Sequence, residues 1–355
     1  MLTEHYKNQI QAASNDKSAL RLRGGGSKDW YGETPHGAIL DTRAYAGIVD
    51  YEPTELVITA RCGTPLIEIE AALAAQRQML AFEPPHFGPG ATIGGVMACG
   101  LSGPRRASAG ALRDFVLGAE LMDGRGQRLV FGGQVMKNVA GYDVSRLLAG
   151  SLGTLGLLLQ VSLKVLPLPF AEISLRFAIS EIEALARLNA WAGQPLPISA
   201  SCWHDGVLTL RLSGAQAAVS AARQQLGGDL VADDGAFWYS VREQAHPFFA
   251  GGAAIWRLSV PSNASALVLK GQQLIEWGGA QRWLKLDAAA DPASAARIRT
   301  IATAAGGHAT LFRSKADGVG VFHPLAPALA RIHQRLTLSF DPAGIFNPGR
   351  MYKEF

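Results

Sequence analysis

The residues with the clearest chemical meaning form three glycine-rich stretches in the first half of the chain. They are Arg23-Gly-Gly-Gly-Ser-Lys28, Phe87-Gly-Pro-Gly-Ala-Thr-Ile-Gly-Gly-Val96 and Gly150-Ser-Leu-Gly-Thr-Leu-Gly156. Successive backbone N–H groups in such loops form a concave site that can bind an anion such as a diphosphate. Each stretch alone could be an ordinary tight turn, but the three together predict a large phosphate-bearing cofactor.

Two common nucleotide-binding motifs are excluded. The nicotinamide fingerprint needs Gly-x-Gly-x-x-Gly between a strand and a helix. The stretch from Gly88 to Gly94 has one residue too many, and Pro89 favours a turn over the start of a helix. The sequence also contains no Gly-x-x-x-x-Gly-Lys-Ser/Thr, which excludes a P-loop.

Further motifs lie outside these loops. They are Gly141-Tyr-Asp-Val144 and, near the end of the chain, Phe340-Asp-Pro342 followed by Phe346-Asn-Pro-Gly-Arg350. Taken in order, the loops and motifs resemble the vanillyl-alcohol-oxidase type of FAD-binding fold. Within that group, segments 135–144 and 306–313 are similar to the FAD-binding E subunits of bacterial glycolate oxidases. The resemblance covers about residues 18–167 and the C-terminal motif.

The resemblance implies non-covalent FAD along the loops. Relatives that bind flavin covalently use a histidine in the first loop, where this chain has Ser27 and Lys28. The diphosphate is expected on the first two loops, the adenosine and ribose along the third, and the isoalloxazine beside the C-terminal motif. The expected FAD contacts are Gly24, Gly25, Gly26, Ser27, Lys28, Pro89, Gly90, Ala91, Thr92, Gly94, Gly95, Gly110, Gly141, Gly150, Ser151, Gly153, Leu155, Asn347 and Arg350. A cation such as Arg350 stabilises the negative charge of a reduced flavin.

Substrate chemistry is expected in Gly306-Gly-His-Ala-Thr-Leu-Phe-Arg313. The resembling α-hydroxy-acid dehydrogenases carry Gly-His-x-Gly-Asp-Gly-Asn, whose histidines help to hold substrate and metal. This chain keeps one candidate base, His308, and one candidate carboxylate anchor, Arg313, with His323 following. Oxidation of an α-hydroxy acid needs a base, a cation for the carboxylate and a hydride acceptor. His308 could also be a strand-end histidine, and no metal site is expected.

Composition excludes several classes of protein. The 355 residues carry a net charge of +4 without a basic stripe, so nucleic acid is not an expected partner. The three cysteines are far apart and lack iron–sulfur spacing, which predicts reduced thiols. The charge-free runs are too short or too broken by glycine and proline to span a membrane, and the N-terminus lacks the apolar core of a signal peptide. We therefore expect a cytoplasmic protein, with peripheral attachment at the inner membrane through partners left open.

The periodicity predicts an α+β protein. Residues 1–168 are expected to form a two-part FAD-binding domain, 169–323 a ferredoxin-like α/β cap, and 324–355 a return to the first domain. Expected helices include 4–16, 137–148, 264–277 and 324–338, and Thr64 is expected to cap a helix that begins near Pro65. Two rounds of strand–helix–strand after residue 171 predict an antiparallel sheet with helices on one face.

The resemblance leaves three functions open. The first is a glycolate oxidase subunit that works on a small 2-hydroxy acid with a sister catalytic flavoprotein and an iron–sulfur subunit. The second is an FAD-bearing scaffold or relay without substrate chemistry of its own. The third is a stand-alone sugar or alditol oxidase of the same fold.

Overall fold

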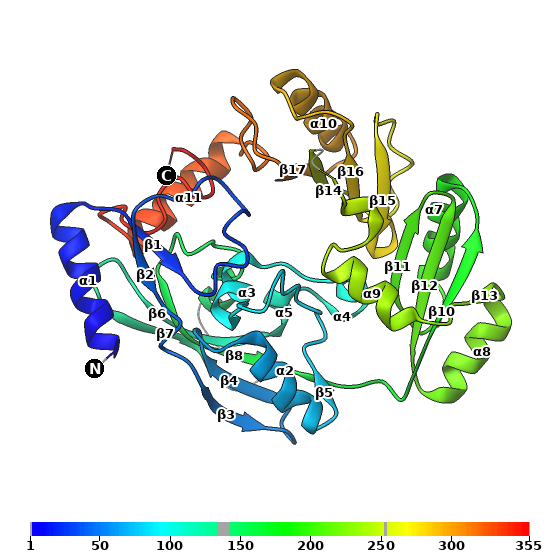
Figure 1. The fold of residues 1–355 in the computed structure, drawn as a ribbon, viewed down its shortest axis with the longest axis horizontal. Coiled ribbons are helices and arrows are strands. Elements are labelled where there is room, and N and C mark those ends of the chain that lie inside the picture. The colour runs from blue at the N-terminus through cyan, green and yellow to red at the C-terminus, as the bar shows by residue number, and fades with distance from the viewer. Residues whose placement is uncertain (1, 134–142, 252–253, 355) are drawn as a thin grey trace. The chain divides into compact units, whose positions relative to one another are not determined.

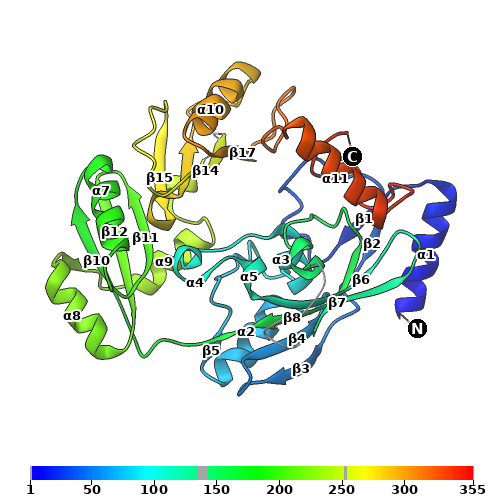
Figure 2. The same ribbon diagram turned by 180° about the vertical axis from the view of Figure 1, so that it is seen from behind.

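The computed structural model describes residues 2–133, 143–251 and 254–354, and these form two compact units. The first contains Met1–Leu101, Ala111–Pro167 and Pro324–Phe355, and the second contains Ser102–Gly110 and Leu168–His323. Figures 1 and 2 show the elements of each unit from two sides. The short segment Ser102–Gly110, which lies in sequence within the expected first domain, groups with the second unit.

A five-stranded antiparallel sheet forms the centre of the first unit. Its strand order is β3 (Ile48–Glu52), β4 (Val57–Arg61), β8 (Leu157–Lys164), β6 (Val116–Met122) and β7 (Arg128–Gly132). Every residue of β6 is buried, whereas β7 alternates between exposed and half-buried residues as an edge strand does.

A smaller parallel pair positions the first glycine loop. β1 (Leu20–Arg23) pairs with β2 (Ala38–Asp41), and the backbone at Phe346 bridges to Leu20 on the other side. Helix α1 (Leu2–Asp16) covers this region through buried Tyr6 and Ile10. One core cluster therefore joins the N-terminal helix, β1 and the C-terminal segment.

The remaining elements of the first unit are short, apart from two helices. They are α2 (Leu66–Ala75), β5 (Gln78–Met79), α3 (Ile93–Cys99), α5 (Leu112–Phe115), α6 (Val144–Leu147), β9 (Leu166–Pro167) and α11 (Pro327–Phe340). The expected Thr64 cap is wrong: the Thr64 hydroxyl donates to the Arg61 carbonyl and accepts from the Gly47 N–H, and Pro65 is at the N-cap of α2. Of the expected helix 137–148, residues 137–142 lie outside the described residues and only α6 is helical.

The second unit is an eight-stranded antiparallel sheet made of two ferredoxin-like halves, which confirms the expected cap fold. The strand order is β13 (Asp229–Leu230), β10 (Ala171–Ala178), β12 (Val207–Gly214), β11 (Ile198–His204), β15 (Gln272–Glu276), β16 (Gln281–Lys285), β14 (Ile255–Ser259) and β17 (His308–Arg313). When the four strands of each half are numbered along the chain, β10–β13 lie in the order 4-1-3-2 and β14–β17 in the reverse order. The two halves meet where β11 pairs with β15.

The helices of the second unit lie on both faces of its sheet, so the expectation of one helical face is wrong. α7 (Glu181–Ala192) and α8 (Gln216–Leu226) pack on the face of β10 that presents Leu175. α9 (Asp234–Arg242) packs on the opposite face, because its Trp238 donates to the Ser174 hydroxyl at 2.8 Å. Successive side chains of a strand point to opposite faces, which separates the two helix sets.

The expected helix 264–277 is also wrong. Residues 261–271 form an irregular loop in the place where the first half of the sheet has α7. Arg282 is fully buried and donates to the carbonyls of Gly279, Ser265 and Ala264. These carbonyls therefore bind a guanidinium instead of helical N–H groups. In this half, α10 (Pro292–Ala304) alone supplies the long helix, packed against the sheet through Ile298.

The segment Ser102–Gly110, which includes α4 (Arg106–Ala109), is held in the second unit by polar and aromatic contacts. Arg105 forms an ion pair with Glu172 at 2.6 Å, and Trp277 Nε1 donates to the Gly103 carbonyl at 3.0 Å. The Arg106 guanidinium lies 4.4 Å from the Trp277 ring centroid. These contacts explain why the segment belongs with the second unit.

Candidate functional site: a glycine-loop cavity

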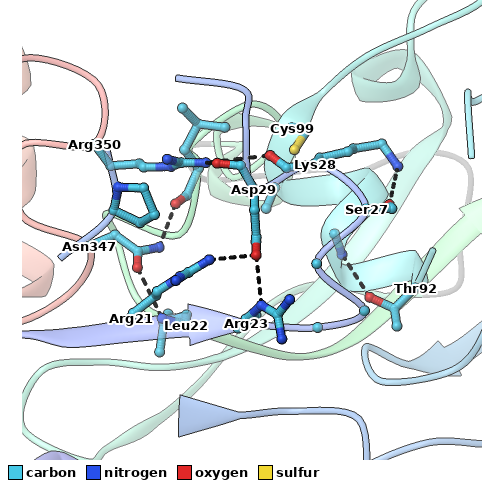
Figure 3. A pocket seen from close by; sticks show the side chains of 17 residues that line it. Arg21, Leu22, Arg23, Ser27, Lys28, Asp29, Thr92, Cys99, Asn347 and Arg350 are labelled. Atoms are coloured by element: carbon cyan, nitrogen blue, oxygen red, sulfur yellow. Dashed lines mark hydrogen bonds and ion pairs between the residues drawn. The ribbon is translucent and has the colours of Figure 1, made fainter. Parts of the chain in front are cut away.

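The first unit contains a cavity lined by the first glycine loop, by α3 and by the C-terminal motif (Figure 3). Its empty volume is about 570 Å³, part of which is open to solvent, and it is bounded by residues 21–29, Thr92, Gly95, Cys99, Leu152, Asn347 and Arg350, among others. A second space of about 400 Å³ shares Arg23, Gly24, Gly95 and Asn347 with it and extends to Cys62 and Gly156. We refer to the two spaces together as the glycine-loop cavity.

The first two glycine loops touch each other at the wall of this cavity. A Cβ atom on Gly25 would lie 1.4 Å from the Gly90 carbonyl oxygen, and one on Gly24 would lie 2.4 Å from Thr92 Oγ1. Glycine is therefore required here by the contact between the loops. Thr92 caps α3, because its Oγ1 accepts the Gly95 N–H at 3.3 Å.

The cavity has an excess of positive charge. Its lining includes Arg21, Arg23, Lys28 and Arg350, and a single carboxylate, Asp29. Asp29 Oδ2 accepts from Arg21 Nη2 at 2.5 Å and from Arg23 Nε at 2.8 Å. The dashed lines of Figure 3 show this pair of contacts. A net positive, glycine-walled cavity matches the diphosphate of FAD in charge and in shape.

The C-terminal motif closes the cavity. Asn347 Oδ1 accepts the Leu22 N–H at 3.0 Å, and Asn347 Nδ2 donates to the Leu152 carbonyl at 2.7 Å. Arg350 is buried and donates to the Asp29 carbonyl at 2.9 Å and to the Glu33 carbonyl. Burial lowers the pKa of Arg350 from its ordinary value. The motif thereby joins the first and third glycine loops and places a cation in the cavity wall.

The structure brings together many of the expected FAD contacts. Those that line the cavity are Gly24, Gly25, Gly26, Ser27, Lys28, Thr92, Gly94, Gly95, Gly153, Asn347 and Arg350. Those outside its lining are Pro89, Gly90, Ala91, Gly150, Ser151 and Leu155; Gly110 lies in the second unit, and Gly141 lies outside the described residues. Gly90 does not line the cavity itself, but it lies against Gly25, which does.

Sequence reasoning missed several cavity residues. Arg21, Arg23 and Asp29 all line the cavity, as do Cys62 and Cys99. A signal was present, because Arg21 and Arg23 alternate on one strand and so share a face of it. Burial raises the pKa of Cys99 to about 11, although Lys28 and Arg350 oppose the rise.

The candidate catalytic residues lie on β17 in the second unit. Alternation alone would point His308 and Arg313 to opposite faces, but the β14–β17 register shifts between Ile255 and Trp256. His308 pairs with Ser259 and Arg313 with Ile255, and these β14 residues share a face. Arg313 donates to Gln244 Oε1 at 3.1 and 2.8 Å. Partial burial, Arg257 and His323 lower the pKa of His308.

Comparisons with known proteins agree with this architecture. The family profile described as "FAD binding domain" matches residues 3–132. The chain is 53% identical over 346 residues to glycolate oxidase subunit GlcE of Escherichia coli (strain K12), covering 98% of this chain and 96% of the relative. It is 29% identical over 188 residues to glycolate oxidase subunit GlcD of Bacillus subtilis (strain 168), covering 52% of this chain and 40% of the relative. A solved alkyldihydroxyacetonephosphate synthase has a TM-score of 0.66 at 15% identity, covering 96% of this chain and 73% of that one.

The FAD-binding profile and the first relative show that the chain is an FAD-binding oxidoreductase, and its fold is of the vanillyl-alcohol-oxidase type. The synthase contributes evidence for the fold alone. The match to GlcE is 53% identical and covers nearly the whole of both chains, so the chain belongs to the family of FAD-binding GlcE-type glycolate oxidase subunits. In the part of the chain that the structure describes, none of the helices combines the length and the apolar character needed to cross a membrane.

Proposed function

We propose that this chain is the FAD-binding subunit of a glycolate oxidase that converts glycolate to glyoxylate. The observation that carries the proposal is the 53% identity to a glycolate oxidase subunit over nearly the full length of both chains. Residues 1–168 and 324–355 bind FAD in this proposal, and residues 169–323 handle the substrate. An iron–sulfur subunit takes the electrons and a sister flavoprotein completes the complex, which works in the cytoplasm or peripherally at the inner membrane.

The glycine-loop cavity holds the cofactor non-covalently. The backbone N–H groups of Gly24–Gly26 bind the diphosphate in this proposal, together with the Ser27 and Thr92 hydroxyls. Gly153 and the neighbouring Gly150, Ser151 and Leu155 follow the adenosine. The predicted reversible binding is tested by the mass of the denatured protein, which should be that of the polypeptide without flavin.

In this proposal, substrate oxidation removes a hydride from the glycolate Cα and a proton from its hydroxyl. Bound FAD would supply the hydride acceptor. His308 accepts the hydroxyl proton, and its lowered pKa supports this role because the imidazole is neutral near pH 7. Arg313, oriented by Gln244, binds the carboxylate through its planar guanidinium. The positive charge of Arg350 in the cavity wall would stabilise a reduced, negatively charged flavin.

A second candidate function is an FAD relay in which glycolate is oxidised on a partner. The feature that favours it is the 306–313 segment, which keeps a single histidine where the α-hydroxy-acid dehydrogenase motif has more. One experiment separates the two functions: the absorbance of the purified chain is followed during anaerobic addition of glycolate. Bleaching of the flavin bands supports oxidation on this chain. A flavin spectrum that stays oxidised supports the relay. The absence of flavin after reconstitution with excess FAD would refute both.

A further inference from the structure

The C-terminal motif reaches the cavity through a turn that a buried carboxylate organises. Asp341 follows the last residue of α11 and is fully buried. Its Oδ2 accepts the Phe346 N–H at 2.7 Å, and its carbonyl accepts the Gly344 N–H at 3.1 Å. The side chain and backbone of Asp341 therefore both fix the residues just before Asn347.

The backbone after this turn joins the β1–β2 pair as a further extended segment. The Leu20 N–H donates to the Ile345 carbonyl at 2.7 Å, and the Asn347 N–H donates to the Leu20 carbonyl at 2.9 Å. The Arg350 N–H then donates to the Asn347 carbonyl at 3.1 Å. An unbroken series of hydrogen bonds thus leads from the Asp341 carboxylate to the two C-terminal residues in the cavity wall.

The burial of Asp341 is costly. Its Oδ1 meets no hydrogen-bond donor among residues 2–133, 143–251 and 254–354, and a Cβ on Gly124 would lie 2.6 Å from it. Burial raises the pKa of Asp341 and nearby Asp123 adds to the rise, while the N–H groups of residues 344–346 oppose it. The β6–β7 turn closes over the carboxylate, because the Gly124 N–H donates to the Phe340 carbonyl at 2.8 Å. Burying a carboxylate is unfavourable, and the N–H groups of the turn offset that cost only in part, because the pKa of Asp341 remains raised.

We propose that Asp341 is a positioning residue of the flavin site, whose carboxylate fixes the 344–346 turn and so sets where Asn347 and Arg350 lie in the glycine-loop cavity. The inference rests on the proposed contacts of Asn347 and Arg350 with FAD. Asp341 itself acts at a distance from the cofactor, because it is absent from the lining of both spaces. It governs the affinity for FAD and the potential of the bound flavin through the two residues that do line them.

The test compares Asp341→Asn with Asp123→Asn, a matched change of a second buried carboxylate. Asp123 accepts from the N–H groups of Arg125 and Gln127 within the β6–β7 turn. FAD is titrated into each apoprotein, and the midpoint potential of the bound flavin is measured. We expect Asp341→Asn to weaken FAD binding about tenfold, equal to about 1.4 kcal/mol, and to shift the potential to more negative values. Asp123→Asn should lower thermal stability and leave both flavin properties unchanged.

A double-mutant cycle with Asn347→Ala separates positioning from general destabilisation. If Asp341 acts through Asn347, the effects on the FAD dissociation constant are non-additive. Additive effects, or wild-type affinity and potential in Asp341→Asn while Asn347→Ala weakens binding, would overturn the inference and leave the proposed FAD site intact. Wild-type flavin properties in both Asn347→Ala and Arg350→Gln would overturn the proposed contacts and the inference with them.

Discussion

The contact between the first two glycine loops can be tested by adding one methyl group. In Gly25→Ala the new Cβ would lie 1.4 Å from the Gly90 oxygen, and real Cβ atoms essentially never come closer than 3.0 Å to such an atom. The loops must therefore separate by at least 1.6 Å, since 3.0 minus 1.4 is 1.6. Overpacking of this kind costs about 1–3 kcal/mol of stability. If the loss falls on the FAD-bound form, it lowers the affinity for FAD by about 5- to 150-fold, because each 1.4 kcal/mol changes a dissociation constant about tenfold.

The assay is titration of FAD into the apoprotein, followed by flavin fluorescence, together with thermal denaturation of the FAD-free chain. Gly133→Ala is the matched control, because a Cβ at Gly133 meets no atom of the described part of the chain within 4 Å. Gly90→Ala should have an intermediate effect, since its Cβ would lie 3.2 Å from the Gly25 oxygen. FAD affinity of Gly25→Ala within about twofold of that of the control would show that the loop contact does not shape the cofactor site, and would refute the reasoning.

Three further predictions follow from individual contacts. Asn347→Ala leaves the Leu22 N–H and the Leu152 carbonyl without their side-chain partner. We expect the free energy of unfolding, measured by chemical denaturation, to fall by about 2–4 kcal/mol, and Asn347→Asp to have an intermediate effect because its carboxylate can still accept the Leu22 N–H. A wild-type denaturation midpoint for Asn347→Ala would contradict this prediction. Burial and His204 lower the pKa of His246 to about 4, so the folded chain favours the neutral imidazole. The free energy of unfolding should therefore fall by up to about 3 kcal/mol as the pH drops from about 6.5 towards 4. His246→Asn should reduce this dependence on pH. Burial raises the pKa of Cys99 to about 11, so alkylation of this thiol at pH 8 should be slow. Bound FAD should slow the alkylation further, because Cys99 lines the cavity. Rapid labelling of Cys99 in the FAD-bound chain would contradict the placement of the cofactor.

The local elements were largely predictable from the sequence. Helices α1 and α11 lie close to the expected ranges 4–16 and 324–338, because helical periodicity depends on neighbours a few residues apart. The failures came where a distant residue decides the local structure. Arg282 binds the carbonyls of the 261–271 loop, so a stretch with helical spacing stays irregular. The Thr64 hydroxyl does not cap α2, because it bonds to the backbone of Arg61 and Gly47 instead.

The candidate site divides in the same way. Glycine and threonine in the loops could be predicted because the chemistry of a diphosphate site requires those residue types. Asn347 and Arg350 were expected at the site because their motif resembles that of the FAD-binding family. Asp29 was not, because its role depends on the two arginines of β1 that converge on its carboxylate. The sequence showed Asp341 only as part of a turn motif, and it gave no indication that this carboxylate is buried.

The sequence by itself indicated a phosphate-bearing cofactor and the residues of the glycine loops, since both follow from short-range spacing. The assignment of FAD and the ferredoxin-like character of the second unit followed from the family resemblance. The tertiary structure decided why several of those residues are required. Gly25 is fixed by the carbonyl of Gly90, and Asn347 by the backbones of Leu22 and Leu152. Contacts between residues so far apart in the chain arise only when the core brings the loops together, and no local pattern encodes them.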